Sequence, residues 1–216
     1  MVDQHGPTDR YAPLFLVLIA TLLLSPFLAS GPAPRVAMVV LVGLVVLSSL
    51  RATGVGNWRS MLGLVGLGVA AVIPAAVASG TAVETIVLVI FAIGMAVGPP
   101  NIVRRIFEHD RITLELVVAA LCAYLQIGFA FGFGYAAIDA VTSDLLAGAS
   151  DQYFFDYIYF SFVTMTTVGF GDITAVTVLG RSLAIVETLL GQIFLVVLVA
   201  YLVGTLSSNG QALEKD

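Results

Sequence analysis

The sequence predicts an all-α membrane protein with six transmembrane helices in each chain. Of its 216 residues, 59% are hydrophobic and only 11% are charged, whereas about 25% of the residues in a soluble domain are charged. Long uncharged stretches separate the charges, and a bilayer core of about 30 Å is crossed by about 20 apolar helical residues. Helices are expected because every backbone polar group in lipid must be satisfied internally.

Six stretches have the composition of a membrane span: residues 11–29, 35–50, 60–78, 84–98, 113–138 and 178–207. The second is short, and we expect Arg35 and Arg51 at its ends to reach toward the two interfaces. Pro99 and Pro100 are expected to end the fourth helix, because proline lacks the backbone N–H. A signal peptide cleaved near residues 29–31 is the alternative interpretation of the first stretch.

The basic residues predict the orientation, because cytoplasmic loops carry an excess of lysine and arginine. With a cytoplasmic N-terminus, only Arg35 and Arg181 of the nine basic residues fall outside. Both termini are then cytoplasmic, and we expect a multi-pass protein of the plasma or inner membrane, surrounded by lipid. The net charge of −5 gives no support to a nucleic-acid partner.

Residues 101–112 are predicted to form a short amphipathic helix on the cytoplasmic surface of the membrane. Ile102 and Ile106 share its apolar face, while Arg104 points away from that face. Asn101 is a suitable N-cap for this helix. The helix is expected to act either as a mechanical coupler between the fourth and fifth spans or as a basic interfacial linker.

The stretch between the fifth and sixth spans is aromatic and apolar, yet it is too short to cross a bilayer and return. It ends in Thr-Met-Thr-Thr-Val-Gly-Phe-Gly-Asp at residues 164–172. A phosphate-binding loop is excluded, because the string has no lysine and no strand precedes it. Placed between two long apolar spans, this string resembles the selectivity-filter signature of potassium channels, and the whole layout loosely resembles that of six-span prokaryotic potassium channels.

The resemblance implies which atoms would meet the ion. A potassium ion sheds its water in such a filter, and rings of backbone carbonyls replace the water. The carbonyls of Thr167, Val168, Gly169 and Phe170, with the Thr167 hydroxyl, would form the K⁺ sites. Gly169 and Gly171 suit a backbone that alternates in handedness. Most of the family has tyrosine where this chain has Phe170, so a hydrogen bond from that hydroxyl is absent.

By the same resemblance, residues 153–166 would form a re-entrant pore helix that contains Thr164 and Thr166. Its partly negative C-terminus would face a cation in the cavity below. Its aromatic residues would form a collar around the filter: Tyr153, Phe154, Tyr157, Tyr159, Phe160 and Phe162.

Acidic residues are expected to make the outer mouth electronegative and so to concentrate cations there. Asp172 follows the filter directly and is the strongest candidate. Asp139 and Asp144, by contrast, are expected to be solvated loop acids.

The sixth span resembles the inner, pore-lining helix of the family. Gly191 stands where the family places its hinge glycine, although a packing glycine is the alternative. The helical period then places four residues on the cavity wall: Gln192, Leu195, Val199 and Val203. The lower cavity would be apolar and suited to gating by dewetting.

Glu187 is an acid within a membrane span, which by default indicates a function. It lies five residues before Gln192 and therefore about 140° from the cavity face. We expect it to pack behind the filter, to hydrogen-bond the pore helix and to be partly protonated. A snorkelling or simply buried acid is the alternative.

The fourth span carries no arginine, so voltage sensing by moving arginines is not expected. The chain divides into a four-helix membrane domain (1–100), the linker (101–112) and a pore domain (113–216). The resemblance implies a homotetrameric, potassium-selective channel that passes dehydrated K⁺ passively, with no enzymatic activity and no organic cofactor. A weakly selective cation channel, a potassium-transporter-type subunit and a regulatory subunit of a larger channel are the alternatives.

Overall fold

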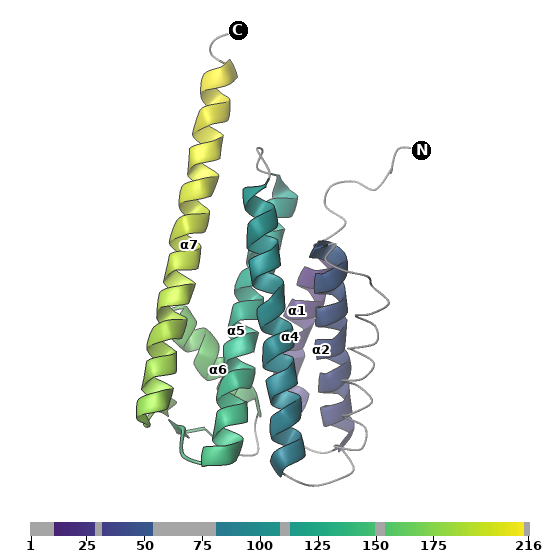
Figure 1. Ribbon diagram of the computed structural model, residues 1–216, viewed down its shortest axis with the longest axis vertical. Coiled ribbons are helices and arrows are strands. Elements are labelled where there is room, and N and C mark those ends of the chain that lie inside the picture. Colours follow the sequence, from purple (N-terminus) through teal and green to yellow (C-terminus); the bar gives the residue numbers. More distant parts are fainter. Residues whose placement is uncertain (1–10, 29–31, 54–80, 109–112, 150–153, 214–216) are drawn as a thin grey trace.

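The computed structural model describes residues 11–28, 32–53, 81–108, 113–149 and 154–213, and this part of the chain is almost entirely helical (Figure 1). The predicted third span, residues 60–78, lies outside the described residues. So do residues 109–112 at the end of the predicted linker.

The N-terminal helices form one side of the bundle. Helix α1 (Ala12–Leu24) continues into the 3₁₀ helix η1 (Ser25–Leu28) and is followed by α2 (Pro32–Thr53). Pro13 stands in the first turn of α1, where the missing proline N–H has no intrahelical partner to lose. Helix α1 packs against both α2 and α5, so it links the N-terminal helices to the rest of the chain.

Helix α4 (Thr81–Phe107) continues through Pro99 and Pro100, so the predicted end of the fourth helix at residue 98 is wrong. Residues 101–107 continue the same helix and do not start a separate one. Asn101 does not cap a new N-terminus, because its side-chain amide donates to the Val97 carbonyl at 2.7 Å.

Tertiary burial explains why the prolines do not stop α4. Met95 before them and Ile102 and Ile106 after them are all buried, and their spacing keeps them on one face of a single helix. Arg105 adds a contact to α2, since its guanidinium donates to the Ala52 carbonyl at 2.6 Å. Ending the helix at the prolines would expose this apolar face, so packing outweighs the two missing N–H groups.

Helix α5 (Leu114–Thr142) is the central element, and α4 packs along much of its length. The Thr113 hydroxyl caps its start by accepting from the Leu116 N–H. Two of its glycines allow close helix contacts. A Cβ on Gly128 would lie 2.8 Å from the Phe162 ring, and one on Gly132 would lie 3.0 Å from the Ile158 Cα.

The remaining elements surround a short helix, α6 (Phe154–Met165), which lies between α5 and the long helix α7 (Val178–Leu213) (Figure 1). Two-residue strands flank it, β1 (Leu146–Ala147) and β2 (Thr174–Ala175). They pair antiparallel, with Leu146 opposite Ala175. This small sheet, which the sequence analysis did not predict, ties the loop after α5 to the loop before α7.

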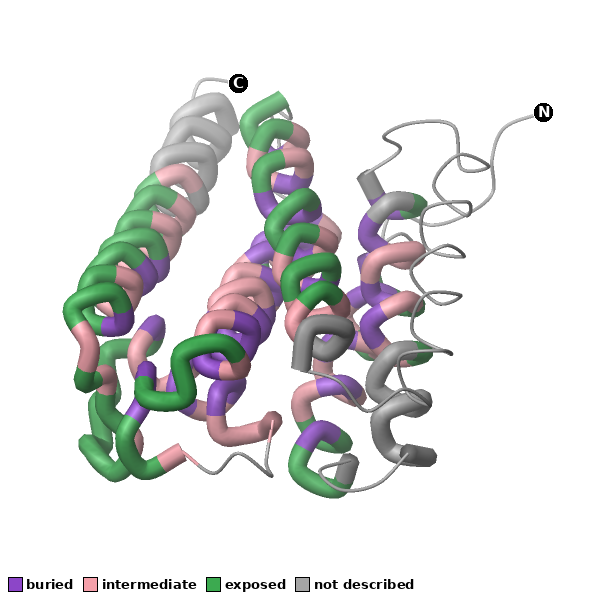
Figure 2. The backbone as a smooth tube through the Cα atoms, turned by 60° about the horizontal axis from the view of Figure 1, so that its bottom comes forward, coloured by how far each residue is buried: buried purple, intermediate pink, exposed green. Residues whose placement is uncertain are grey.

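Three helices of the described chain are long and apolar enough to cross a membrane: Thr85–Phe107, Leu114–Thr142 and Val178–Tyr201. The apolar stretches Ala12–Phe27 and Val40–Ser49 are shorter. Most of the described part of α7 is exposed along its length (Figure 2), and many of its exposed side chains are large and apolar. A helix with such a surface needs lipid or another protein surface around it.

Candidate functional site

The segment 164–172 begins at the C-terminal end of α6 and leads into the loop before β2. Its backbone alternates in handedness, because φ is +60° at Thr167, +58° at Gly169 and +81° at Gly171, whereas Val168 and Phe170 keep negative φ. Glycine adopts positive φ freely. Thr167 is β-branched, and a residue held in this region is strained by about 1–3 kcal/mol, so the surrounding contacts must hold it there.

Helix α6 supplies those contacts through its last carbonyls. The Thr167 N–H donates to the Thr164 carbonyl at 3.0 Å. The N–H groups of Val168 and Gly169 both donate to the Val163 carbonyl, at 3.1 and 3.3 Å. The segment is therefore folded back onto the end of the helix that precedes it.

This hydrogen bonding also determines where the carbonyls of the segment point. In a planar trans peptide the N–H and the C=O point in opposite directions. Because the N–H groups of Val168 and Gly169 point back at α6, the carbonyls of Thr167 and Val168 point away from it. The segment thus presents successive carbonyl oxygens on its exposed side.

The glycines are required by the backbone and not by crowding within one chain. A Cβ built on Gly169 or Gly171 meets nothing within 4 Å. The neighbouring side chains are unusually exposed for their type, since Val168 is 54% and Phe170 is 70% accessible. An exposed pair of large apolar side chains beside a row of carbonyls is typical of a surface that another chain covers.

Tyr159 of α6 braces the end of the segment. Its ring lies parallel to that of Phe170, with centroids 6.4 Å apart and an interplanar angle of 4°. Its hydroxyl donates to Asp172 Oδ2 at 2.8 Å. This hydrogen bond holds the pKa of the Asp172 carboxyl below its usual range, because it stabilises the charged form. Asp172 itself is exposed.

Other aromatic side chains of α6 pack away from the segment and against α5. Phe154 stacks on Phe133 with ring centroids 4.9 Å apart, and Phe160 meets Tyr135 edge to face at 5.0 Å. These contacts anchor α6 to the core, whereas Tyr159 reaches the segment itself.

Glu187 is fully buried where α5, α6 and α7 meet. The Tyr135 hydroxyl of α5 donates to its Oε2 at 2.8 Å, and the Ser161 hydroxyl of α6 hydrogen-bonds its Oε1. Ser161 Oγ also lies 2.7 Å from the Gly128 carbonyl, to which it donates. Tyr135 and Ser161 are partners that the sequence analysis did not identify, because nothing in the local pattern connects three separate helices.

Gly191 lies where α7 passes closest to the end of α6. A Cβ at this position would be 2.6 Å from Met165 Cγ and 2.8 Å from the Met165 carbonyl oxygen. Helix α7 is unbroken through this residue. The close approach therefore provides a packing reason for glycine here, which is the alternative interpretation raised by the sequence.

The remaining predicted site residues lie at the end of α6 and along α7. The hydroxyl of Thr166 donates to the Phe162 carbonyl at 2.6 Å, and the Thr164 carbonyl accepts from the Thr188 hydroxyl of α7 at 3.4 Å. Gln192, Leu195 and Val199 lie on α7 and are partly or largely exposed in a single chain. The Val203 side chain lies outside the described residues.

Asp139 differs from its prediction as a solvated loop acid. It lies within α5 and is buried. Its carboxylate accepts from the Leu145 N–H at 2.6 Å and from the Tyr157 hydroxyl. It therefore joins the end of α5 to α6, because a carboxylate near the end of a helix can satisfy both the turn that follows and a neighbouring hydroxyl.

Comparison with known proteins shows a similarity for this part of the chain. Residues 119–208 match the family model described as "Ion channel", and this range includes most of α5, all of α6, the segment 164–172 and most of α7. No curated protein and no solved structure matches the chain. With its long apolar helices, the chain is a membrane protein, and its residues 119–208 are similar to the ion-channel family.

Proposed function

We propose that this protein is a potassium-selective channel and that residues 167–171 are its selectivity filter. The observation that carries the proposal is the alternation of φ at Thr167, Gly169 and Gly171, combined with N–H groups that fold back onto α6. Together they aim consecutive carbonyl oxygens in one direction, which is the arrangement that replaces the water shell of a potassium ion.

A single chain would supply only part of the coordination shell. The carbonyl oxygens of one chain would contact an ion from one side only. The exposed Val168 and Phe170 side chains also need neighbours to cover them. Four copies around an axis would close the ring of carbonyls and bury these side chains. We therefore propose a homotetramer in which each chain has six spans and α6 is the pore helix.

In this arrangement α6 directs its C-terminal end toward the permeation path. The end of a helix carries a partial negative charge that attracts cations. Asp172, held ionised by Tyr159, would add negative charge at the outer mouth. Helix α7 would line the cavity below with Gln192, Leu195, Val199 and Val203, and Gly191 would be its hinge.

A weakly selective cation channel is the second candidate, and Phe170 is the observation that favours it. Its side chain has no hydroxyl to bond, so within the chain it is held by stacking on Tyr159. Stacking restrains a ring less firmly than a hydrogen bond does, and a wider filter would admit other hydrated cations.

Bi-ionic reversal potentials distinguish the two candidates. The purified full-length protein is placed in a planar bilayer with KCl on one side and NaCl on the other. A selective filter gives a reversal potential close to the potassium equilibrium potential, whereas a current that reverses near zero supports the weakly selective channel. Gly169→Ala is expected to abolish the current, because alanine does not tolerate φ of +58°.

Gly134→Ala is the matched control for that variant. Gly134 lies in α5, and a Cβ there meets nothing within 4 Å. The control is expected to conduct as the wild type does. A current that survives Gly169→Ala with unchanged selectivity would contradict the assignment of the filter.

A further inference from the structure

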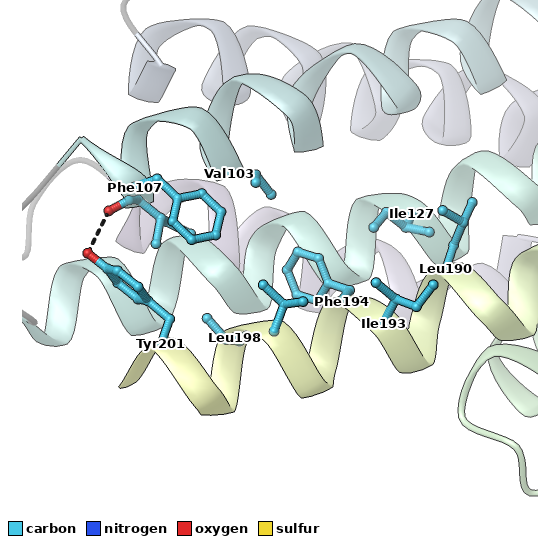
Figure 3. A pocket seen from close by; sticks show the side chains of 10 residues that line it. Val103, Phe107, Ile127, Leu190, Ile193, Phe194, Leu198 and Tyr201 are labelled. Atoms are coloured by element: carbon cyan, nitrogen blue, oxygen red, sulfur yellow. Dashed lines mark hydrogen bonds between the residues drawn. The ribbon is translucent and has the colours of Figure 1, made fainter. Parts of the chain in front are cut away.

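An apolar cavity of about 240 Å³ lies behind α7, between the C-terminal part of α4, the middle of α5 and α7 (Figure 3). Val103, Ile127 and Phe194 contribute to its walls from the three helices. The Tyr201 hydroxyl closes one end by donating to the Ile106 carbonyl at 3.2 Å, and the Phe107 and Tyr201 rings meet edge to face at 5.2 Å.

The location of the cavity indicates what can enter it. Every lining residue falls within one of the three helices that are long and apolar enough to cross a membrane. Leu190, Ile193 and Val197 line the cavity and are also exposed, so the cavity is open at the surface of α7. Water does not fill an apolar cavity of this kind, whereas hydrocarbon chains surround it on the membrane side.

The cavity is separate from the proposed ion pathway. At about 100° per residue, Tyr201 lies nearly opposite Gln192 around α7, and Gln192 is on the proposed pore side. Copies of the chain that meet around the pore would therefore use the other face of α7. The separation from the pore rests on the proposed function, whereas the volume and the apolar lining of the cavity do not.

An exposed basic residue adjoins the lining residues in the sequence of α4. Arg104 follows the lining residue Val103 on α4, and its side chain is 71% exposed. Its partner is Glu108, at 3.4 Å. Exposed ion pairs of this kind contribute little stability. The Arg104 guanidinium can therefore leave Glu108 and bind an anion that forms more hydrogen bonds with it. A phosphate group offers two oxygens that match the guanidinium fork.

We infer that this cavity is a binding site for an anionic phospholipid of the surrounding bilayer, with an acyl chain between α4, α5 and α7 and the phosphate at Arg104. An acyl chain gains little from leaving one apolar medium for another. Its gain in the cavity comes from close dispersion contacts, and the charge of Arg104 selects the headgroup.

Native mass spectrometry of the purified full-length chain tests the site without requiring conduction. The protein in detergent is exposed to equal amounts of phosphatidylglycerol and phosphatidylcholine with identical acyl chains. The wild type is expected to retain phosphatidylglycerol about fivefold over phosphatidylcholine, the preference that one arginine supplies. Arg104→Gln is expected to lose the preference while it still retains lipid.

Filling the cavity tests the acyl chain. Val197→Trp is expected to reduce lipid retention about tenfold, since overpacking excludes the chain. Ile193→Phe is a second cavity-filling variant and is also expected to reduce lipid retention. Residue 193 is 58% exposed, so it tolerates a larger side chain. The matched controls are Ile93→Trp, which is exposed on α4 away from the cavity, and Arg51→Gln in the last turn of α2. Both controls are expected to bind lipid as the wild type does.

Three results would overturn the site. The first is a wild type that shows no preference for phosphatidylglycerol. The second is unchanged lipid retention in both Val197→Trp and Ile193→Phe. The third is a loss of assembly in those variants with lipid retention intact, which would mean that a second copy of the chain covers the cavity. Loss of potassium selectivity alone would count against the proposed function and leave the lipid site standing.

Discussion

Tyr159 shows how one side chain acts on both the shape and the charge of the candidate filter. The Tyr159 ring is parallel to Phe170, and its hydroxyl reaches Asp172 at 2.8 Å. The same side chain therefore positions the aromatic residue of the segment and keeps the acid at its end ionised. A substitution that removes the Tyr159 hydroxyl and keeps the ring separates the effect on charge from the effect on shape.

Tyr159→Phe is expected to make the current more sensitive to outside acid. The hydrogen bond lowers the Asp172 pKa by stabilising the carboxylate. Without it the pKa rises toward its ordinary value, so Asp172 takes up its proton at a higher pH as the solution is acidified. The conductance measured against outside pH should then begin to fall at a higher pH than in the wild type. Identical pH profiles would show that Asp172 does not act on the permeant ion.

The hydrogen bonds of Ser161 and Glu187 need one more proton than an ionised Glu187 carboxylate would leave available. Ser161 has one hydroxyl proton, yet its oxygen hydrogen-bonds both the Gly128 carbonyl and the Glu187 carboxyl. A protonated Glu187 satisfies every group, because it donates to Ser161 while Ser161 donates to Gly128 and Tyr135 donates to the other carboxyl oxygen. A neutral Glu187 would then join α6 to α5 and α7 through these hydrogen bonds.

Glu187→Gln and Glu187→Leu test this junction as a pair. Glutamine can donate to Ser161 and accept from Tyr135, so its thermal unfolding in detergent should stay close to that of the wild type. Leucine leaves the buried Tyr135 hydroxyl without an acceptor, at a cost of about 1–3 kcal/mol. We also expect faster loss of potassium current during sustained opening in the leucine variant. Equal damage from both substitutions would show that a charged carboxylate is required.

At the scale of the elements, α4 and α7 each have a local structure that the helix propensities of their own residues do not predict. Helix α4 stays continuous across two prolines because its buried face continues beyond them. Helix α7 approaches the end of α6 so closely that only glycine fits at residue 191. In both cases the packing partner decides the local structure.

The double substitution Pro99→Ala with Pro100→Ala is expected to raise the melting temperature and to leave the helical circular-dichroism signal unchanged. A proline inside a helix costs about 3 kcal/mol or more, and the helix already spans both residues. Pro13→Ala is the control, because Pro13 stands in the first turn of α1 and should give no gain. A clear increase in helical signal in the double variant would mean that the prolines do end the helix.

Gly191→Ala is expected to lower stability by about 1–3 kcal/mol, as overpacking does, and to disturb selectivity. The new methyl group would lie 2.8 Å from the Met165 carbonyl oxygen, and the proposed filter follows α6 at that end. Thermal unfolding and the bi-ionic reversal potential measure the two effects. Gly134→Ala, with open space around its Cβ, should change neither, and a harmless Gly191→Ala would mean that α6 and α7 can move apart freely.

At the scale of the whole molecule, one chain exposes more apolar surface than water tolerates. The large apolar side chains along α7 and those of the 164–172 segment are exposed together. A tetramer would cover the segment and part of α7, and the bilayer would cover the rest. In the proposed tetramer, assembly and ion binding would be coupled, because the proposed K⁺ sites form only where four chains meet.

Cross-linking of the purified protein is expected to give a ladder that ends at four chains. The assembled form should also melt at a higher temperature in KCl than in NaCl, since an ion that binds only the folded assembly stabilises it by about 2.7 kcal/mol at 100 times its dissociation constant. A melting temperature independent of the cation would argue against potassium sites in the assembly. A ladder that ends at two chains would contradict fourfold closure.

Much of the fold was predictable because the relevant signals are local. Apolar length predicts spans in the described regions of α4, α5 and α7. The glycines at residues 169 and 171 predicted a backbone of alternating handedness, which the φ angles show. Each of these depends on properties that neighbouring residues carry by themselves.

Other features depend on residues far apart in the chain and were decided by the tertiary structure. The continuity of α4, the burial of Asp139, the partners of Glu187 and the cavity behind α7 all arise where separate helices meet. The sequence by itself determined a helical membrane protein with a glycine-containing segment between two long spans. Only the packing of α4, α5, α6 and α7 decided which polar groups are satisfied and where a lipid chain fits, because those energies depend on contacts and not on composition.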